Sequence, residues 1–153
     1  MRIRALPDQR PVAVAGLAGF SLVGHLNGEH MKFLLIMNVN PAALEALTQE
    51  EMEALGSGHG RFIDTITQSG EMITTQALAD PSQSAVVRVR GGQRTVTDGP
   101  YAEAKEHLGG FYLIDCEDRE RAYELAAMVP DASIEGMGVE VRQVIFSDGS
   151  LEM

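Results

Sequence analysis

Several residue types are scarce in this sequence, and each scarcity excludes a class of protein. The 153 residues include no tryptophan and a single cysteine, Cys116, so an intrachain disulfide is impossible and a reducing cytoplasm is the expected location. Only 12 Lys and Arg stand against 22 Asp and Glu, which gives a net charge of −10. Because nucleic acids and anionic membranes attract Lys and Arg, we expect neither as a partner.

Motifs for metals and common cofactors are missing too. The four histidines, at positions 25, 30, 59 and 107, form no H-x-x-x-H pattern. There is no G-x-G-x-x-G and no P-loop, so the sequence predicts neither a metal site nor a cofactor.

The first thirty residues differ from the rest. They hold three arginines and an apolar stretch, residues 11–24, which three glycines interrupt and no A-x-A cleavage site follows. The stretch is too short to span a bilayer. Codons for Gly28-Glu29 can read as a bacterial ribosome-binding sequence upstream of Met31. We therefore expect residues 1–30 to be a translated leader or a disordered extension, and residues 31–153 to be the folded domain.

A capping box predicts the start of the first helix. The Thr48 hydroxyl can accept a bond from the N–H of Glu51, whose carboxylate can bond back. Apolar residues then follow at helical spacing, and Gly70 suits the helix end. The glycines between positions 56 and 60 each cost about 1 kcal/mol relative to alanine in a helix, so we expect an interruption there.

Six segments have the composition of strands: residues 32–39, 71–78, 85–90, 93–97, 110–116 and 139–146. Gly91-Gly92 predicts a type I′ hairpin turn, and Asp118 caps a second helix that ends before Pro130. The order β-α-β, hairpin, β-α-β is typical of a ferredoxin-like split βαβ, an α+β fold. Because two helices cover only one sheet face, we predict a homodimer that pairs two sheets.

Residues 96–115 carry a more specific signal. They read VTDGPYAEAKEHLGGFYLID and resemble the signature of the DGPF branch of the YCII-related family. Tyr101 stands where that branch has phenylalanine, and Gln143 stands where a proline is usual. The resemblance covers residues 31–146 and implies a dimeric α+β barrel. It also implies a His and Asp site in the wider family, with lyase or isomerase-like chemistry on small cyclic or chloroaromatic compounds.

His59 is the main candidate for that chemistry. It lies on the apolar face of the first predicted helix, where the resemblance implies the family's histidine, and an imidazole with a pKa of about 6.5 can move a proton near neutral pH. The alternative is a packed histidine. Asp98 is the first candidate for its acidic partner and Asp80 the second, although turn formation alone explains Asp98.

The remaining candidates lie in a charged loop. Tyr101, Glu103 and Lys105 are predicted to contact a ligand at the rim of a cleft, although solvation explains most surface charges. Two functions follow from these residues and from the resemblance. One is acid–base catalysis on a small molecule. The other is a non-catalytic dimer that binds a ligand or a partner, because genes of the DGPF branch often lie beside extracytoplasmic-function sigma factors.

Overall fold

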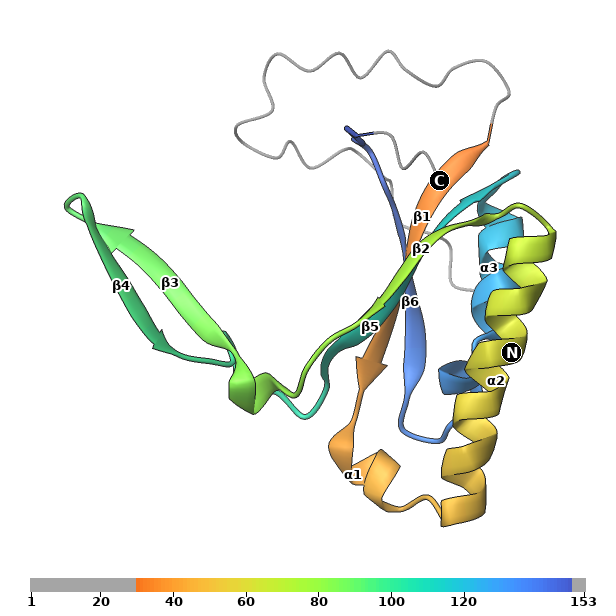
Figure 1. Ribbon diagram of the computed structural model, residues 1–153, viewed down its shortest axis with the longest axis horizontal. Helices are drawn as coiled ribbons and strands as arrows, with labels where there is room; N and C mark the ends of the chain where they lie inside the picture. Colours follow the sequence, from red (N-terminus) through yellow and green to blue (C-terminus); the bar gives the residue numbers. More distant parts are fainter. Residues whose placement is uncertain (1–29, 150–153) are drawn as a thin grey trace, which may run out of the picture.

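The computed structural model describes residues 30–149. The predicted leader therefore lies outside the described residues, apart from His30, and remains a prediction. The elements in chain order are β1 (Met31–Val39), α1 (Pro41–Glu45), α2 (Gln49–Gln68), β2 (Met72–Ala77), η1 (Pro81–Gln83), β3 (Ala85–Arg90), β4 (Gln93–Asp98), β5 (His107–Cys116), α3 (Arg119–Met128), η2 (Pro130–Ser133) and β6 (Gly138–Gln143) (Figure 1). Within this part of the chain, no helix combines the length and the apolar character needed to cross a membrane.

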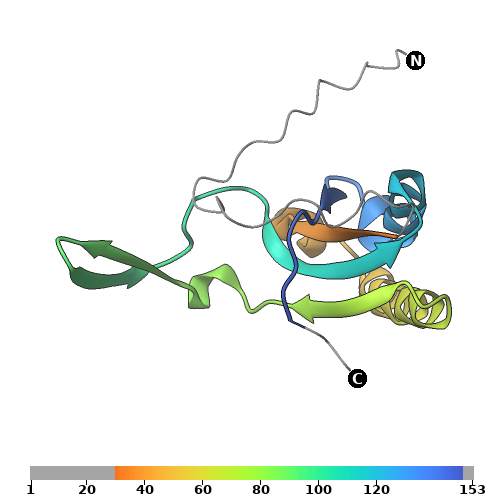
Figure 2. The ribbon, with the colours of Figure 1, turned by 90° about the horizontal axis from the view of Figure 1, so that it is seen from above.

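The strands form one four-stranded sheet and one separate hairpin. The sheet has the order β2-β5-β1-β6, and each neighbouring pair is antiparallel. β3 and β4 pair only with each other, and this hairpin arm projects away from the sheet and helices (Figures 1 and 2). The α+β class predicted from the sequence is confirmed.

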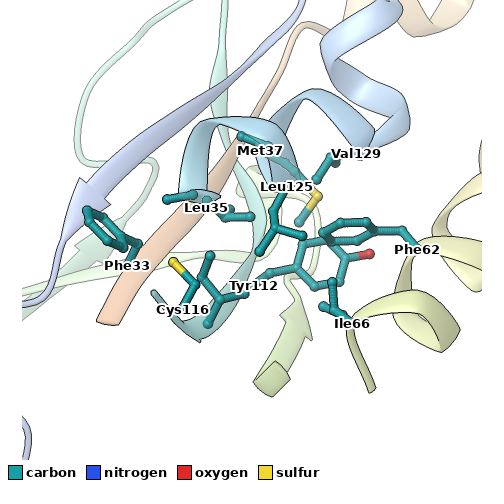
Figure 3. Packing of buried hydrophobic residues seen from close by; sticks show 12 residues of the cluster. Phe33, Leu35, Met37, Phe62, Ile66, Tyr112, Cys116, Leu125 and Val129 are labelled. Carbon is teal, nitrogen blue, oxygen red and sulfur yellow. The ribbon is translucent and has the colours of Figure 1, made fainter. Parts of the chain in front are cut away.

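The core lies between the sheet and the two long helices, which occupy the same side of it (Figure 1). Alternate side chains of β1 and β5 point toward α2 and α3, as expected for strands with one face on a core. Phe33, Leu35, Ile66 and Leu125 are fully buried there (Figure 3). Burying each such side chain contributes roughly 1.5–3 kcal/mol, so this layer supplies most of the stability of the body.

α2 is one continuous helix of 20 residues, so the predicted interruption at the glycines is wrong. Its start is as expected, with the Thr48 capping box present in both directions. One of these glycines allows close packing, because a Cβ on Gly58 would lie 2.6 Å from Cγ of Pro130. Contact of α2 with η2 and the sheet then offsets the cost of the glycines. At its end Gly70 has a φ of +76°, which confirms the predicted stop.

The hairpin arm has the predicted turn, with Gly91 and Gly92 at φ values of +57° and +76°. The short helix α1 was not predicted. The Asn40 side chain accepts bonds from two N–H groups at its start, and Pro41 occupies its first position.

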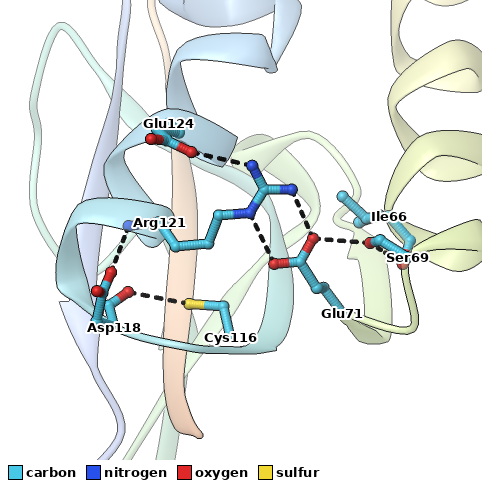
Figure 4. Close-up of polar contacts among 7 residues, drawn as sticks. All are labelled: Ile66, Ser69, Glu71, Cys116, Asp118, Arg121 and Glu124. Carbon is cyan, nitrogen blue, oxygen red and sulfur yellow. Dashed lines mark hydrogen bonds and ion pairs between the residues drawn. The ribbon is translucent and has the colours of Figure 1, made fainter.

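A polar network ties the end of α2 to α3 (Figure 4). The Arg121 guanidinium donates two hydrogen bonds to Glu71, 2.9 Å from Nε and 2.8 Å from Nη2, and a third bond reaches Glu124. Ser69 donates to the same Glu71 carboxylate at 2.7 Å. The Arg121 bonds hold the pKa of Glu71 below its ordinary value, so the carboxylate stays charged although its residue is only 9% exposed.

Candidate functional site

His59 lies in the middle of α2 and faces the sheet, as its helical spacing predicted. Its Nδ1 is 2.7 Å from the hydroxyl of Tyr112 on β5, and its Nε2 is 2.7 Å from Oδ1 of Asp131 on η2. The ring also stacks loosely on Tyr112, with 6.0 Å between ring centroids. One imidazole therefore joins three elements of the body.

Burial and the charge of Asp131 raise the pKa of Tyr112 to about 12, so its hydroxyl keeps its proton near neutral pH. When the His59 ring is neutral, that hydroxyl donates to Nδ1, and the ring proton is on Nε2, toward Asp131. The Nε2 contact has ion-pair distance but is not aligned as a hydrogen bond. Oδ1 of Asp131 consequently has no hydrogen bond within the described part of the chain.

The acidic neighbour of His59 is neither of the two aspartates that the sequence suggested. Asp80 and Asp98 lie at the base of the hairpin arm, well away from α2 (Figure 1). Asp131 was missed because it follows a proline directly after α3, where an aspartate is expected to be an exposed turn residue. The signal that could have revealed it is Gly58, whose missing side chain allows α2 to approach Pro130.

The His59 cluster offers little access to a substrate. The His59 side chain is 25% exposed, and that of Asp131 is 6% exposed. A general acid or base needs a ring nitrogen within hydrogen-bond reach of its substrate, and both nitrogens of His59 already have protein neighbours. His59 lines neither of the hollows described below. This geometry favours the packed-histidine alternative.

A hollow of about 760 Å³ opens at the base of the hairpin arm. We call it the arm hollow. Four side chains that can exchange a proton line it, Asp80, Tyr101, Glu106 and His107, beside apolar walls such as Leu78 and Leu108. A carboxylate, an imidazole and a phenol around one hollow are the groups that proton transfer requires. The structure thus brings Asp80 and Tyr101 together, two residues that the sequence had placed in separate roles.

Asp80 is the anchored member of this group. It caps η1, and its Oδ1 accepts a hydrogen bond of 2.9 Å from the N–H of Ser82. Hydrogen bonds from Ser82 lower the pKa of Asp80, and the electrostatic effect of His107 lowers it further. The carboxylate is therefore charged near neutral pH. The effect of His107 on Asp80 is electrostatic only, since the two residues share no hydrogen bond or ion pair in the described structure.

The other predicted residues lie around the arm hollow. Glu103 and Lys105 occupy the exposed loop between β4 and β5, but they are not part of the lining. Asp98 ends β4 opposite Ala85. Tyr101 is 82% exposed, and the guanidinium of Arg88 lies 5.7 Å from its ring centroid.

A second hollow, of about 660 Å³, lies between α1, the start of α2 and η2. Its lining is mainly apolar, including Leu47, Leu55 and Ile134, and its acidic groups are Glu51 and Glu135. Glu51 is already engaged in the capping box. Nowhere in residues 30–149 do three His, Cys, Asp or Glu side chains gather as a metal site would require.

Two comparisons bear on these sites. Residues 31–146 match the YCII-related domain family. The chain is also similar to the uncharacterized protein R00369 of Rhizobium meliloti (strain 1021), with 28% identity over 122 residues. That alignment covers 79% of this chain and 98% of the relative. The name of the relative states no activity.

Proposed function

The chain belongs to the YCII-related domain family, and from this premise we propose that it is an enzyme that moves a proton on a small molecule bound in the arm hollow. One observation supports the choice of site: Asp80, Tyr101, Glu106 and His107 line the same hollow. His59 lines neither this hollow nor the second one. We also propose, from the resemblance of residues 96–115, that the chain belongs to the DGPF branch of this family.

In the proposed reaction His107 is the acid–base group. It takes a proton from a carbon next to an electron-withdrawing group of the substrate. It then returns the proton to another atom, in an isomerisation, or to a leaving group, in an elimination. The charged Asp80 stabilises the imidazolium that forms in between, and Tyr101 and the apolar walls hold a ring. Such positioned proton transfer contributes typically about 10²–10⁴-fold to a rate.

The proposal includes a ferredoxin-like barrel and a homodimer. The strand order β2-β5-β1-β6, with helices on one side only, supports the former. The sheet face opposite α2 and α3 supports the latter, because it presents half-buried apolar side chains, Leu34, Phe111 and Leu113, that none of the described helices covers. A second sheet packed on this face would remove them from water.

A different observation favours a non-catalytic function. His107 and Asp80 are not hydrogen-bonded, so the acid–base pair is not assembled in the isolated chain. On this alternative the dimer binds a ligand, or a protein partner in an extracytoplasmic-function sigma factor system, without turnover.

Hydrogen exchange in D₂O tests the reaction even while the substrate is unidentified. A library of small cyclic carbonyl compounds is incubated with the protein, and loss of C–H signals is followed by ¹H NMR. We expect at least one compound to exchange, and His107→Gln to slow that exchange by about 10²-fold or more. Glu120→Gln, a charge change on the exposed surface of α3 and outside the lining, is the control.

The outcomes separate the candidates. Exchange that survives His107→Gln but is lost in His59→Gln moves the chemistry to the His59 cluster. Binding without exchange supports the non-catalytic function. Failure of every compound to bind or exchange removes the arm hollow as the site.

A further inference from the structure

The hairpin arm carries an uncovered apolar face. Val87 and Val89 alternate with arginines along β3, so they point to one side of the ribbon. Val96 of β4 pairs directly with Val87 and extends the same side. These three residues, the valine face, are 60%, 60% and 58% exposed.

A two-stranded ribbon of this kind is not stable without further packing. An isolated two-stranded hairpin is marginally stable in water, and it needs a third strand or a packed surface to hold its shape. No described element packs on β3 or β4 as the helices pack on the sheet. Three neighbouring valines left in water are therefore a docking surface that needs an occupant.

The charge of the arm identifies that occupant. The arm, residues 85–98, contains three arginines, Arg88, Arg90 and Arg94, and one acidic residue, Asp98, so its net charge is +2 and the rest of the chain has a net charge of −12. A basic arm on an acidic body is complementary to a second copy of the same chain, and complementary charge guides association. A contact in which each copy offers its arm to the other's body also closes into a two-fold dimer.

We infer that the valine face of each arm docks on the acidic body of a second copy and that this contact completes the arm hollow. Val87 belongs both to the valine face and to the lining of the hollow, so a copy docked on the face reaches the edge of the hollow. Tyr101, 82% exposed in the single chain, lies at the same opening. The docking goes beyond the sheet-to-sheet contact proposed above, and only its role as a roof rests on the proposed function.

A matched pair of variants on opposite faces of the arm tests the docking. Val89→Gln puts an amide on the valine face, whereas Thr95→Gln puts the same amide on the other face, beside Arg88. Both positions are exposed in the single chain, so the body folds in each variant, and circular dichroism checks this. Sedimentation equilibrium then measures the dimer dissociation constant of the full chain, whose mass is 16.5 kDa.

We expect a dimeric wild type, a rise of at least about tenfold in the dissociation constant for Val89→Gln, and less than about threefold for Thr95→Gln. Raising NaCl from 0.1 to about 1 M shortens the screening length and weakens the wild-type dimer. A monomeric wild type overturns the inference, as does capture of the arm by heparin or nucleic acid in place of a second copy.

Equal effects of the two variants also overturn the docking, and they leave the sheet-to-sheet dimer and the proposed function standing. If Val89→Gln weakens the dimer but no compound binds to the wild type, the docking is supported and the proposed function is contradicted. A dimer in which Val89→Gln weakens both association and ligand binding, while Thr95→Gln weakens neither, supports the docking and the roof together.

Discussion

The four-stranded body and the hairpin arm are built from the same kinds of strand residue, yet their surroundings are opposite. Leu35 and Ile114 of the body are fully buried, whereas Val89 of the arm is 60% exposed. Arg121 of the body is bonded to two carboxylates, whereas Arg94 of the arm is exposed. The difference lies in the layer above each strand. The body has helices over one face of its sheet, and the arm has nothing in the described chain.

Alternating apolar residues in a strand therefore predict that one of its faces is buried, but they do not predict which element or molecule buries that face. In the body the cover comes from α2 and α3, which belong to the described chain. In the arm no described element provides it, and by our inference a second copy does. Substitutions in each region test how far the two differ, from the largest expected effect to the smallest.

Truncation of the core gives the largest contrast. Leu125→Ala removes a fully buried side chain and leaves a cavity, so we expect the free energy of unfolding to fall by about 2–5 kcal/mol. Val89→Ala, at 60% exposure, should change it by less than about 0.5 kcal/mol. Urea denaturation at low protein concentration, where the chain is monomeric, measures both. A comparable loss in the arm variant would show that the arm is part of the folding unit.

The Glu71–Arg121 pair comes next. Glu71→Gln removes a charged acceptor of two arginine bonds, and we expect a loss of about 1–3 kcal/mol at pH 7. Because the pKa of Glu71 is lowered below 4.5 in the folded state, its contribution is present above that pH and is lost as the pH falls below it. The difference between variant and wild type should therefore shrink from pH 5 to pH 3. Glu140→Gln, in an exposed pair with Arg142, is the control and should cost less than about 1 kcal/mol.

Tyr112→Phe tests the His59 cluster. Loss of the hydroxyl leaves Nδ1 of His59 without its partner, at an expected cost of about 1–2 kcal/mol. The pKa of Tyr112 is raised from 10.0 to about 12 in the folded state, so its contribution is complete below pH 10 and disappears as the pH rises toward 12. Wild type should thus lose more stability than the variant over that interval. Tyr123→Phe, on a residue 37% exposed, is the control and should change the free energy of unfolding at pH 7 by less than about 0.5 kcal/mol.

The smallest effect comes from glycines of α2. Gly60→Ala meets nothing within 4 Å and should stabilise the body by about 0.5–1 kcal/mol. Gly58→Ala places its new methyl 2.6 Å from Pro130 and should destabilise the body, although it makes the same gain in helix propensity. Thermal melting curves compare the two. If both alanine variants raise the melting temperature, the packing of α2 against η2 does not require glycine at position 58.

Much of the fold could be predicted because its signals are local. The capping box at Thr48, the positive-φ glycine at position 70 and the Gly91-Gly92 turn each depend on a few adjacent residues, and all three are present. The glycines of α2 misled the prediction because packing outweighs propensity. Their cost in the isolated helix is real, but contact of α2 with η2 and the sheet offsets it.

The candidate site was harder to predict because it depends on contacts far apart in sequence. His59 was placed correctly on the inner face of its helix, since 3.6-residue spacing decides this. Its neighbour Asp131 is 72 positions later in the chain, and no local pattern links the two. Asp80 and His107 meet at the arm hollow because the strands they adjoin, β2 and β5, are neighbours in the sheet.

The pairing of β2 with β5 has one more consequence. The N–H of Leu78 bonds to the carbonyl of Gly109 at 2.9 Å, so the chain leaves the sheet and returns to it at almost the same point. Residues 79–106 form the excursion between these two points and contain none of the four strands of the body, so a short turn could replace them. The arm can therefore lengthen, shorten or change its sequence while the four-stranded sheet stays as it is.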